Sequence, residues 1–108
     1  MTTFSIHKYT LNPMAQHQVL SMPVGAVILS VHVQKGLPCL WARVPFGGDL
    51  NHTTRNISIC MTGEVITMGP LESLESLKFL GTYLLHDGVV VQHVFESTNC
   101  AWATWALS

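Results

Sequence analysis

Two tight turns between runs of strand-forming residues constrain the fold of this chain more than any other feature. The first is Gln34-Lys35-Gly36-Leu37 and the second is His86-Asp87-Gly88. Each turn separates segments rich in alternating apolar or β-branched residues, and short glycine-containing connections of this kind favour β-hairpins. Gly36 is the residue expected to need a positive φ. We therefore predict hairpins over residues 26–44 and 77–96.

The first strand of the first hairpin, residues 26–34, alternates between two sets of side chains. Alternation with a period of two is typical of a strand with one buried face. One face is expected to belong to the core, and the other, which carries His32, is expected to be half polar. The set predicted to share the core face is Val27, Leu29, Val31 and Val33.

Weaker strand signals lie at residues 4–11, 16–22 and 56–61, between turns marked by proline and glycine. At most one short helix is predicted, near residues 70–77, where leucines recur about one turn apart after a proline. About seven short strands with largely local pairing predict a mainly β protein, either an antiparallel β-sandwich or a small barrel.

The chain has 108 residues, which suits one domain with one hydrophobic core. The last strand signal ends near residue 96, and an apolar segment with two tryptophans follows it. We therefore expect a single β domain over residues 1–96 and an apolar C-terminal extension over residues 97–108.

Hydrophobic residues make up 48% of the chain and charged residues only 10%, against about 25% in an ordinary soluble protein. A membrane segment does not explain this balance, because no apolar run approaches the roughly 18 residues that a spanning helix needs. The first residues also lack the basic-then-apolar order of a signal peptide. We therefore expect a cytoplasmic homo-oligomer with no membrane partner.

The formal net charge is -1, and the 5 basic residues are spread along the chain. Proteins that grip nucleic acid use many Lys and Arg contacts to phosphates, so nucleic acid is not expected as a partner. The cysteines, Cys39, Cys60 and Cys100, are odd in number and far apart. This favours reduced, buried thiols over a disulfide framework.

Parts of the chain resemble a known family. They are residues 8–11, the segment 22–44 with its run Pro38-Cys39-Leu40-Trp41-Ala42, and residues 79–83 with 93–96. In these parts the chain is similar to an uncharacterised family of small proteins encoded by bacteriophages and prophages, over Lys8 to Glu96. The resemblance implies a phage accessory protein in the cytoplasm of the bacterial host. It carries over no catalytic or binding residue, and residues 97–108 extend beyond the family pattern.

The 6 histidines call for a search for a metal site. No His-x-His, Cys-x-x-Cys or His-Glu-x-x-His pattern occurs in the sequence. No metal and no cofactor is therefore predicted. One alternative stays open, since His32 and His93 both lie mid-strand, where they could face the same side and form a two-His site.

A cysteine nucleophile would need a base beside it and a further group to orient that base. Cys39 and Cys60 lie in apolar strand runs, where burial raises the pKa of a thiol and makes it inert. Most of the 6 acidic residues fall at turns or on the predicted helix. No catalytic residue is predicted, and the chain is not expected to be an enzyme.

Tryptophan and arginine are the residue types most common in binding hot spots. If Leu40 and Ala42 point into the core, the strand pleat turns Trp41 and Arg43 to the opposite face. The alternative is that Trp41 is buried in a core with two sides. Trp102 and Trp105 belong to the C-terminal extension, whose alternation suits a strand added to a sheet edge.

Arg55 lies at the end of a long loop predicted over residues 46–55, which is either a binding loop or a connector. With the two mid-strand histidines it completes the set of candidate binding residues. That set is His32, Trp41, Arg43, Arg55, His93, Trp102 and Trp105.

These expectations favour a non-catalytic phage accessory protein. It is predicted to bind and block a host protein or to sequester a small signalling ligand, as part of phage counter-defence. One alternative is a minor virion or assembly component whose tail docks onto another subunit. The other is a small metal-dependent or Cys/His-dependent enzyme.

Overall fold

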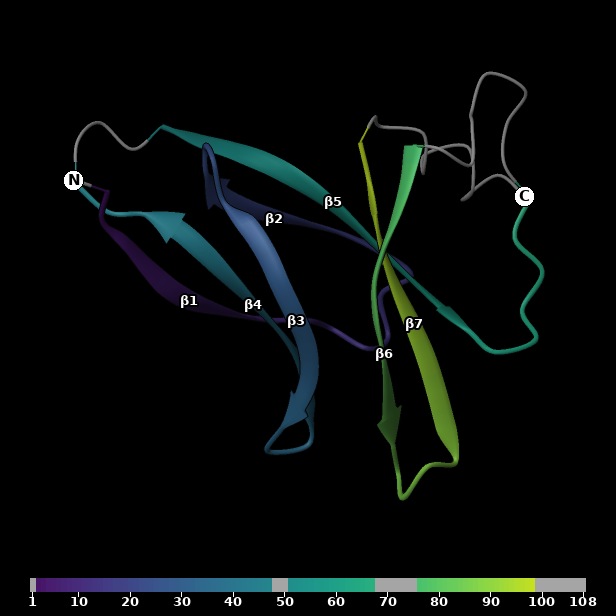
Figure 1. Cartoon of the computed structure of the whole chain (residues 1–108). Helices are drawn as coiled ribbons and strands as arrows, with labels where there is room; N and C mark the ends of the chain where they lie inside the picture. The colour runs from purple at the N-terminus through teal and green to yellow at the C-terminus, as the bar shows by residue number, and fades with distance from the viewer. Residues whose placement is uncertain (1, 48–50, 68–75, 99–108) are drawn as a thin grey trace.

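The computed structural model of this chain describes residues 2–47, 51–67 and 76–98. Strands β1, β4 and β3 form a three-stranded sheet in that order, and β2, β5, β7 and β6 form a four-stranded sheet (Figure 1). All pairings are antiparallel. The strands are β1 (Phe4–Thr10), β2 (His17–Pro23), β3 (Val27–Gln34), β4 (Leu37–Pro45), β5 (His52–Met61), β6 (Leu77–Leu85) and β7 (Val90–Ser97).

The mainly β prediction is confirmed, and the two separate sheets make the fold a small β-sandwich. The short helix predicted near residues 70–77 falls mostly on residues 68–75, which lie outside the described residues. Its last residue, Leu77, already begins β6. Within the described residues, no helix is long and apolar enough to span a membrane.

Both predicted hairpins are confirmed. In the turn between β3 and β4, Lys35 and Gly36 have φ values of 53° and 79°. Two consecutive residues with positive φ give the turn a twist that matches the twist of paired strands. The turn between β6 and β7 holds His86, Asp87 and Gly88, all with positive φ. Local turn chemistry therefore determines both hairpins.

β3 departs from the predicted alternation at Leu29. The pairing of β3 with β4 shifts between Ile28 and Ser30, so Leu29 is an extra residue that forms a bulge. Val31 is consequently buried, whereas Val27 and Leu29 are 37% and 52% exposed. The prediction that the valines of β3 and Leu29 all share the core face is wrong, because a bulge reverses the alternation along a strand.

β5 begins earlier than the sequence predicts. The strand signal starts at residue 56, but β5 begins at His52, and β2 pairs with it as far as Pro23. The loop predicted over residues 46–55 is therefore wrong at its end, where Thr54 and Arg55 lie in a strand. The pairing partner is distant in the sequence, so local composition does not reveal it.

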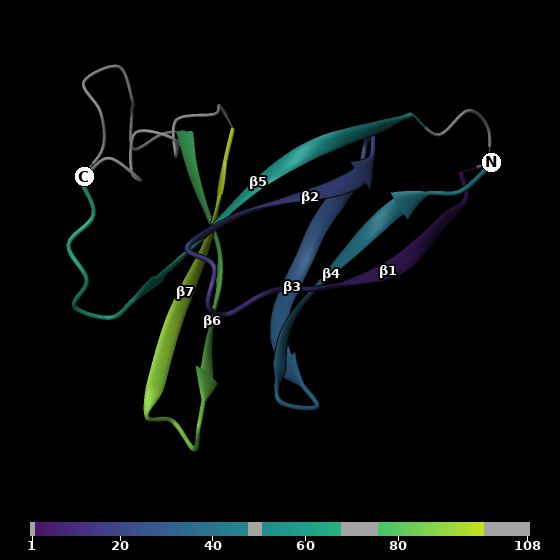
Figure 2. The ribbon, with the colours of Figure 1, turned by 180° about the vertical axis from the view of Figure 1, so that it is seen from behind.

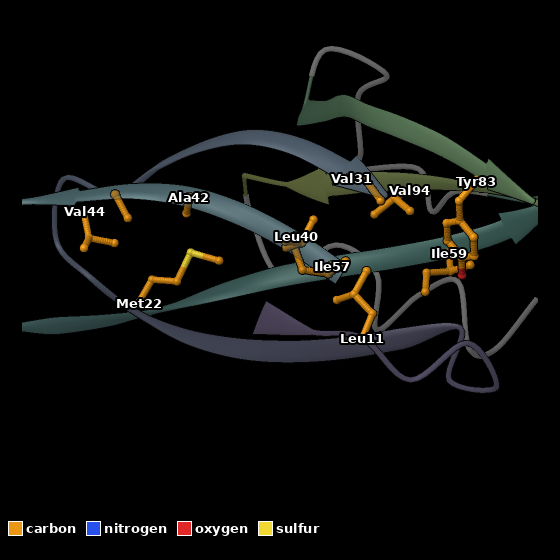
Figure 3. Packing of buried hydrophobic residues seen from close by; sticks show 11 residues of the cluster. Leu11, Met22, Val31, Leu40, Ala42, Val44, Ile57, Ile59, Tyr83 and Val94 are labelled. Atoms are coloured by element: carbon orange, nitrogen blue, oxygen red, sulfur yellow. The ribbon is translucent and has the colours of Figure 1, made fainter. Parts of the chain in front are cut away.

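Buried apolar side chains from the two sheets meet between them (Figure 3). Leu40 and Ala42 come from the three-stranded sheet, and Ile57 and Val94 come from the four-stranded sheet; each is 0% exposed. Burial of such side chains is the main favourable contribution to folding. The buried cluster consists of Leu11, Met22, Ala26, Val31, Leu40, Ala42, Val44, Ile57, Ile59, Tyr83 and Val94.

The two sheets approach each other closely where their edge strands β3 and β6 lie side by side (Figures 1 and 2). A Cβ atom placed on Gly81 of β6 would lie 3.1 Å from Cβ of Val31. The pairing of β6 also shifts between Phe79 and Gly81, so both edge strands carry a bulge. A glycine is needed at this crossing because a larger side chain would push the edges apart.

Candidate partner-binding surface

Arg55 is held inside the sandwich by hydrogen bonds to the chain itself. Its Nε and Nη2 donate to the carboxylate of Glu96, Nη2 at 3.0 Å, and its Nη1 donates to the carbonyl of Ala26 at 2.9 Å. The side chains of Arg55 and Glu96 are only 20% and 10% exposed. The hydrogen bond with Glu96 raises the pKa of Arg55 more than burial lowers it.

This arrangement gives Arg55 a structural role. Arg55 and Glu96 lie on β5 and β7 of one sheet, and Ala26 lies immediately before β3 of the other sheet. The guanidinium therefore ties the two sheets together, and most of its donors are already used. Arg55, predicted as a binding residue, has little capacity left for a ligand.

Trp41 and Arg43 lie on the face of β4 that points away from the core. Leu40, Ala42 and Val44 occupy the inner face and are at most 1% exposed. Alternation along the strand places Trp41 and Arg43 opposite them. Trp41 is half-buried and Arg43 is exposed. The structure therefore has the orientation that the pleat argument predicts.

The strand register surrounds these two residues with side chains from both neighbouring strands. Arg43 pairs with Ile6 on one side and Val27 on the other. Trp41 pairs with Lys8 of β1. We call this outward surface the β1–β4–β3 face. It consists of Phe4, Ile6, Lys8, Val27, Leu29, His32, Trp41 and Arg43.

Several apolar side chains on the β1–β4–β3 face are open to solvent. Phe4, Ile6 and Leu29 are 57%, 48% and 52% exposed. A single exposed apolar residue is ordinary, whereas neighbouring ones form a patch of the kind that marks interaction sites. This face is therefore suited to contact another molecule.

The polar and aromatic groups of the face contact one another. The Arg43 guanidinium carbon lies 6.0 Å from the centre of the Phe4 ring, at the outer limit of a cation–π contact. The rings of His32 and Trp41 are 6.1 Å apart between centroids and tilted. Lys8 Nζ donates to Gln34 Oε1 at 2.7 Å. None of these contacts pairs a cation of the face with a carboxylate.

A hollow of about 420 Å³ opens at one end of the β1–β4–β3 face. Both Phe4 and Arg43 line it, so it is continuous with the exposed patch. Gly25, in a turn with φ of 89°, leaves space beside Pro45. The complete lining is Thr2, Thr3, Phe4, Gly25, Arg43 and Pro45.

The order of charges along the chain is a signal that residue spacing and overall composition do not reveal. Residues 1–47 contain Lys8, Lys35 and Arg43 and no Asp or Glu. All of β1, β3 and β4 lies within this segment. The remainder of the chain holds all 6 acidic residues. The three-stranded sheet is therefore purely basic, although the net charge of the chain is only -1.

The two candidate histidines lie on different sheets. His32 is on β3 beside Trp41, and His93 is on β7. The His93 ring is within hydrogen-bond distance of the hydroxyls of Thr62 and Thr82, at 2.6 and 2.9 Å. In the described part of the chain, no three His, Cys, Asp or Glu side chains gather to form a metal site. The structure therefore gives each histidine its own separate surroundings.

Neither described cysteine has the surroundings of an activated nucleophile. Cys39 is 2% exposed, and burial raises the pKa of the Cys60 thiol. Both are free thiols. The remaining candidate residues, Trp102 and Trp105, lie outside the described residues, as does Cys100.

A second buried polar group lies on the inner side of the four-stranded sheet. The Tyr83 hydroxyl donates to Gln92 Oε1 at 2.5 Å, and Gln92 Nε2 donates to the Pro13 carbonyl at 3.2 Å. Burial raises the pKa of Tyr83 to about 12. The pair ties the loop before β2 to β6 and β7, so its role is structural.

Taken together, the geometry defines a small β-sandwich whose polar interior groups bond to one another and whose three-stranded sheet presents an exposed basic and apolar surface. The chain belongs to the family described as domain of unknown function (DUF7352), whose model matches residues 2–103. The match extends beyond Lys8 to Glu96 at both ends and includes part of the C-terminal extension. No curated protein and no solved structure matches this chain.

Proposed function

We propose that this protein is a non-catalytic binding protein that recognises its partner through the β1–β4–β3 face. The observation that carries the proposal is the run of exposed apolar side chains around Arg43 and Trp41. Large apolar side chains beside an arginine and a tryptophan are the composition of binding hot spots. The interior polar groups, in contrast, are engaged in holding the fold.

The proposal extends to the setting in which the protein acts. It is a bacteriophage accessory protein in the cytoplasm of the bacterial host, where it blocks a host protein or sequesters a small signalling ligand in counter-defence. The sequence resemblance to phage-encoded proteins supports this setting. The low share of charged residues, 10%, supports self-association as well.

The test compares two phenylalanines that lie on different sheets and have nearly the same exposure to solvent. Phe4 is 57% exposed on the three-stranded sheet, and Phe79 is 56% exposed on the four-stranded sheet. Tagged wild-type protein, Phe4→Ser and Phe79→Ser are expressed in the bacterial host. Co-purifying proteins and small molecules are then quantified by mass spectrometry, and the oligomeric state is measured by sedimentation.

We expect Phe4→Ser to reduce the recovered partner by about tenfold and Phe79→Ser to leave it unchanged, since truncating a hot-spot residue costs at least about 1–2 kcal/mol of binding. Equal recovery with both variants would contradict the proposal. So would the presence of the protein in purified virions in stoichiometric amounts, which would identify an assembly component.

A further inference from the structure

We propose that the partner segment recognised by the β1–β4–β3 face is an acidic stretch of protein, and that one of its carboxylates pairs with Arg43 at the hollow. This inference rests on the proposed function and adds the chemistry of the partner to it. Four observations support it: the separation of charge, the state of Arg43, the lining of the hollow and the apolar character of the face.

The first observation is the charge of the three-stranded sheet. Lys8, Lys35 and Arg43 lie on β1, in the turn between β3 and β4, and on β4, with no acidic residue among residues 1–47. Charges of one sign on one surface attract a partner of the opposite sign and repel a like surface. A second copy of this sheet, face to face, would bring like charges together. The favoured occupant is therefore a different, acidic molecule.

The second observation is the contrast between the two arginines. Arg55 donates to Glu96 and to a backbone carbonyl, whereas Arg43 has no carboxylate partner within the described residues. Its guanidinium carbon lies 6.0 Å from the centre of the Phe4 ring. The planar guanidinium offers paired N–H donors whose spacing matches the two oxygens of a carboxylate. Arg43 is therefore positioned to form a bidentate pair with an incoming acid.

The third observation is the hollow beside Arg43. Its volume of about 420 Å³ is ample for an acidic side chain and its stem. Thr2 and Thr3 line it and bring hydroxyl groups that can donate to a carboxylate oxygen. Phe4 and Pro45 provide apolar walls for the methylene groups. The hollow thus combines a cation, hydroxyl donors and apolar surface in one place.

The fourth observation is the kind of side chain beside Arg43, which favours a protein segment over nucleic acid as the partner. The cross-strand partners of Arg43 on the face are the aliphatic Ile6 and Val27, and Leu29 is exposed nearby. The face also has aromatic rings, but its only Lys and Arg side chains are Lys8 and Arg43. Single-stranded nucleic acid is bound mainly by aromatic rings that stack on bases and by many cations that follow the phosphates. Aliphatic side chains instead match the apolar residues of a peptide. The observations therefore favour a segment in which acidic and apolar residues alternate.

The experiment measures binding of defined probes by changes in backbone amide chemical shifts. The main probe is a short capped peptide in which glutamate alternates with valine and phenylalanine. Matched probes replace every glutamate by glutamine or by lysine, and a thymidine oligonucleotide of equal length represents nucleic acid. Each probe is titrated into the full chain at low salt, and the main titration is repeated at high salt.

We expect the glutamate peptide to shift the amides of Phe4, Ile6 and Arg43 in a saturable way, and salt to weaken binding because charge pairs are screened. Arg43→Gln should weaken binding at least about fivefold, as loss of a charge-assisted hydrogen bond does. The affinity of Arg43→Lys should lie between those of the wild-type protein and Arg43→Gln. The matched control is Lys78→Gln, which removes an exposed cation from the four-stranded sheet and should leave binding unchanged.

Four outcomes would overturn the inference. The first three are binding of the glutamine peptide as tight as that of the glutamate peptide, shifts at the same amides with the oligonucleotide, and no difference between Arg43→Gln and Lys78→Gln. Absence of any shift with the glutamate peptide would overturn it as well. If Phe4→Ser releases the cellular partner while Arg43→Gln and high salt do not, the proposed function stands and only the acidic partner is wrong.

Discussion

The two sheets of this protein are alike on their inner faces and different on their outer faces. Leu40 of the three-stranded sheet and Ile57 of the four-stranded sheet are both 0% exposed and meet in one core. On the outside, the three-stranded sheet is basic and has no acidic residue, whereas all 6 acidic residues belong to the rest of the chain. One common core therefore holds the two sheets together, and the charge of their outer faces distinguishes them.

Two arginines differ in the same way as the inner and outer faces of the sheets. Arg55 points inward and its donors are used by Glu96 and Ala26. Arg43 points outward beside an exposed phenylalanine. The same guanidinium group is therefore used within the fold in one sheet and faces outward in the other, and strand alternation decides which.

The largest expected effect tests the equivalence of the inner faces. Leu40→Ala and Ile57→Ala should each lower the free energy of unfolding by about 2–5 kcal/mol, because each leaves a cavity in the same core. Chemical denaturation measures both. If one variant costs several kcal/mol and the other almost nothing, the core belongs to one sheet and the comparison fails.

The next effect concerns the Arg55–Glu96 ion pair, which holds the guanidinium that reaches the carbonyl of Ala26 on the other sheet. Glu96→Gln leaves Arg55 charged and largely buried without its counterion, so we expect a loss of about 2–4 kcal/mol of unfolding free energy. The lower part of that range allows for the 20% exposure of Arg55. The control Arg43→Gln, which removes a charge outside the core, should change stability by less than about 0.5 kcal/mol. A comparable loss for both variants would contradict the division of roles.

The third effect is a pH dependence of the four-stranded sheet. The pKa of Tyr83 is raised to about 12 from an ordinary 10.0. The stabilisation that the folded protein gains from its buried, protonated Tyr83 hydroxyl is complete below pH 10. It should be lost as the pH rises towards 12, which lowers the free energy of unfolding by up to about 2 kcal/mol. Denaturation at several pH values measures this. Tyr83→Phe should remove this part of the decline, and an unchanged pH profile in that variant would assign the decline to other groups.

The smallest effect tests the crossing of β3 and β6. Gly81→Ala places a methyl group 3.1 Å from Cβ of Val31, which is buried and branched and has little room to move. We expect a loss of about 1–2 kcal/mol. Val31→Ala removes the Cγ2 atom that would lie 3.4 Å away but keeps the Cβ atom, so it should lower the cost of Gly81→Ala only in part, and a double-mutant cycle measures that coupling. Strict additivity would show that the strands do not limit each other at this point.

Features set by neighbouring residues could be predicted from the sequence. The turns at Gly36 and Gly88, the bounds of β6 and the outward side of Arg43 all follow from local turn chemistry and strand alternation. Features that depend on distant partners could not. Arg55 and Glu96 are 41 positions apart, and only the pairing of β5 with β7 brings them together.

The same limit explains the error in β3 and the missed surface. The bulge at Leu29 is a property of the pairing with β4, and no residue type in β3 marks it. The basic character of the three-stranded sheet was present in the order of charges, with Lys8, Lys35 and Arg43 unaccompanied by acids. Its meaning depends on knowing that β1, β3 and β4 form one sheet.

The bulge in β3 also gives the strand one residue that the core does not need. Because Leu29 is an extra residue, its deletion would restore regular pairing on both sides of the bulge. Val27 and Ile28 would keep their partners Arg43 and Ala42 and their outer and inner positions, and an exposed leucine would be lost. Loss or gain of one codon in β3 is therefore a single genetic step that changes the apolar content of the outer surface and leaves the core side chains in place.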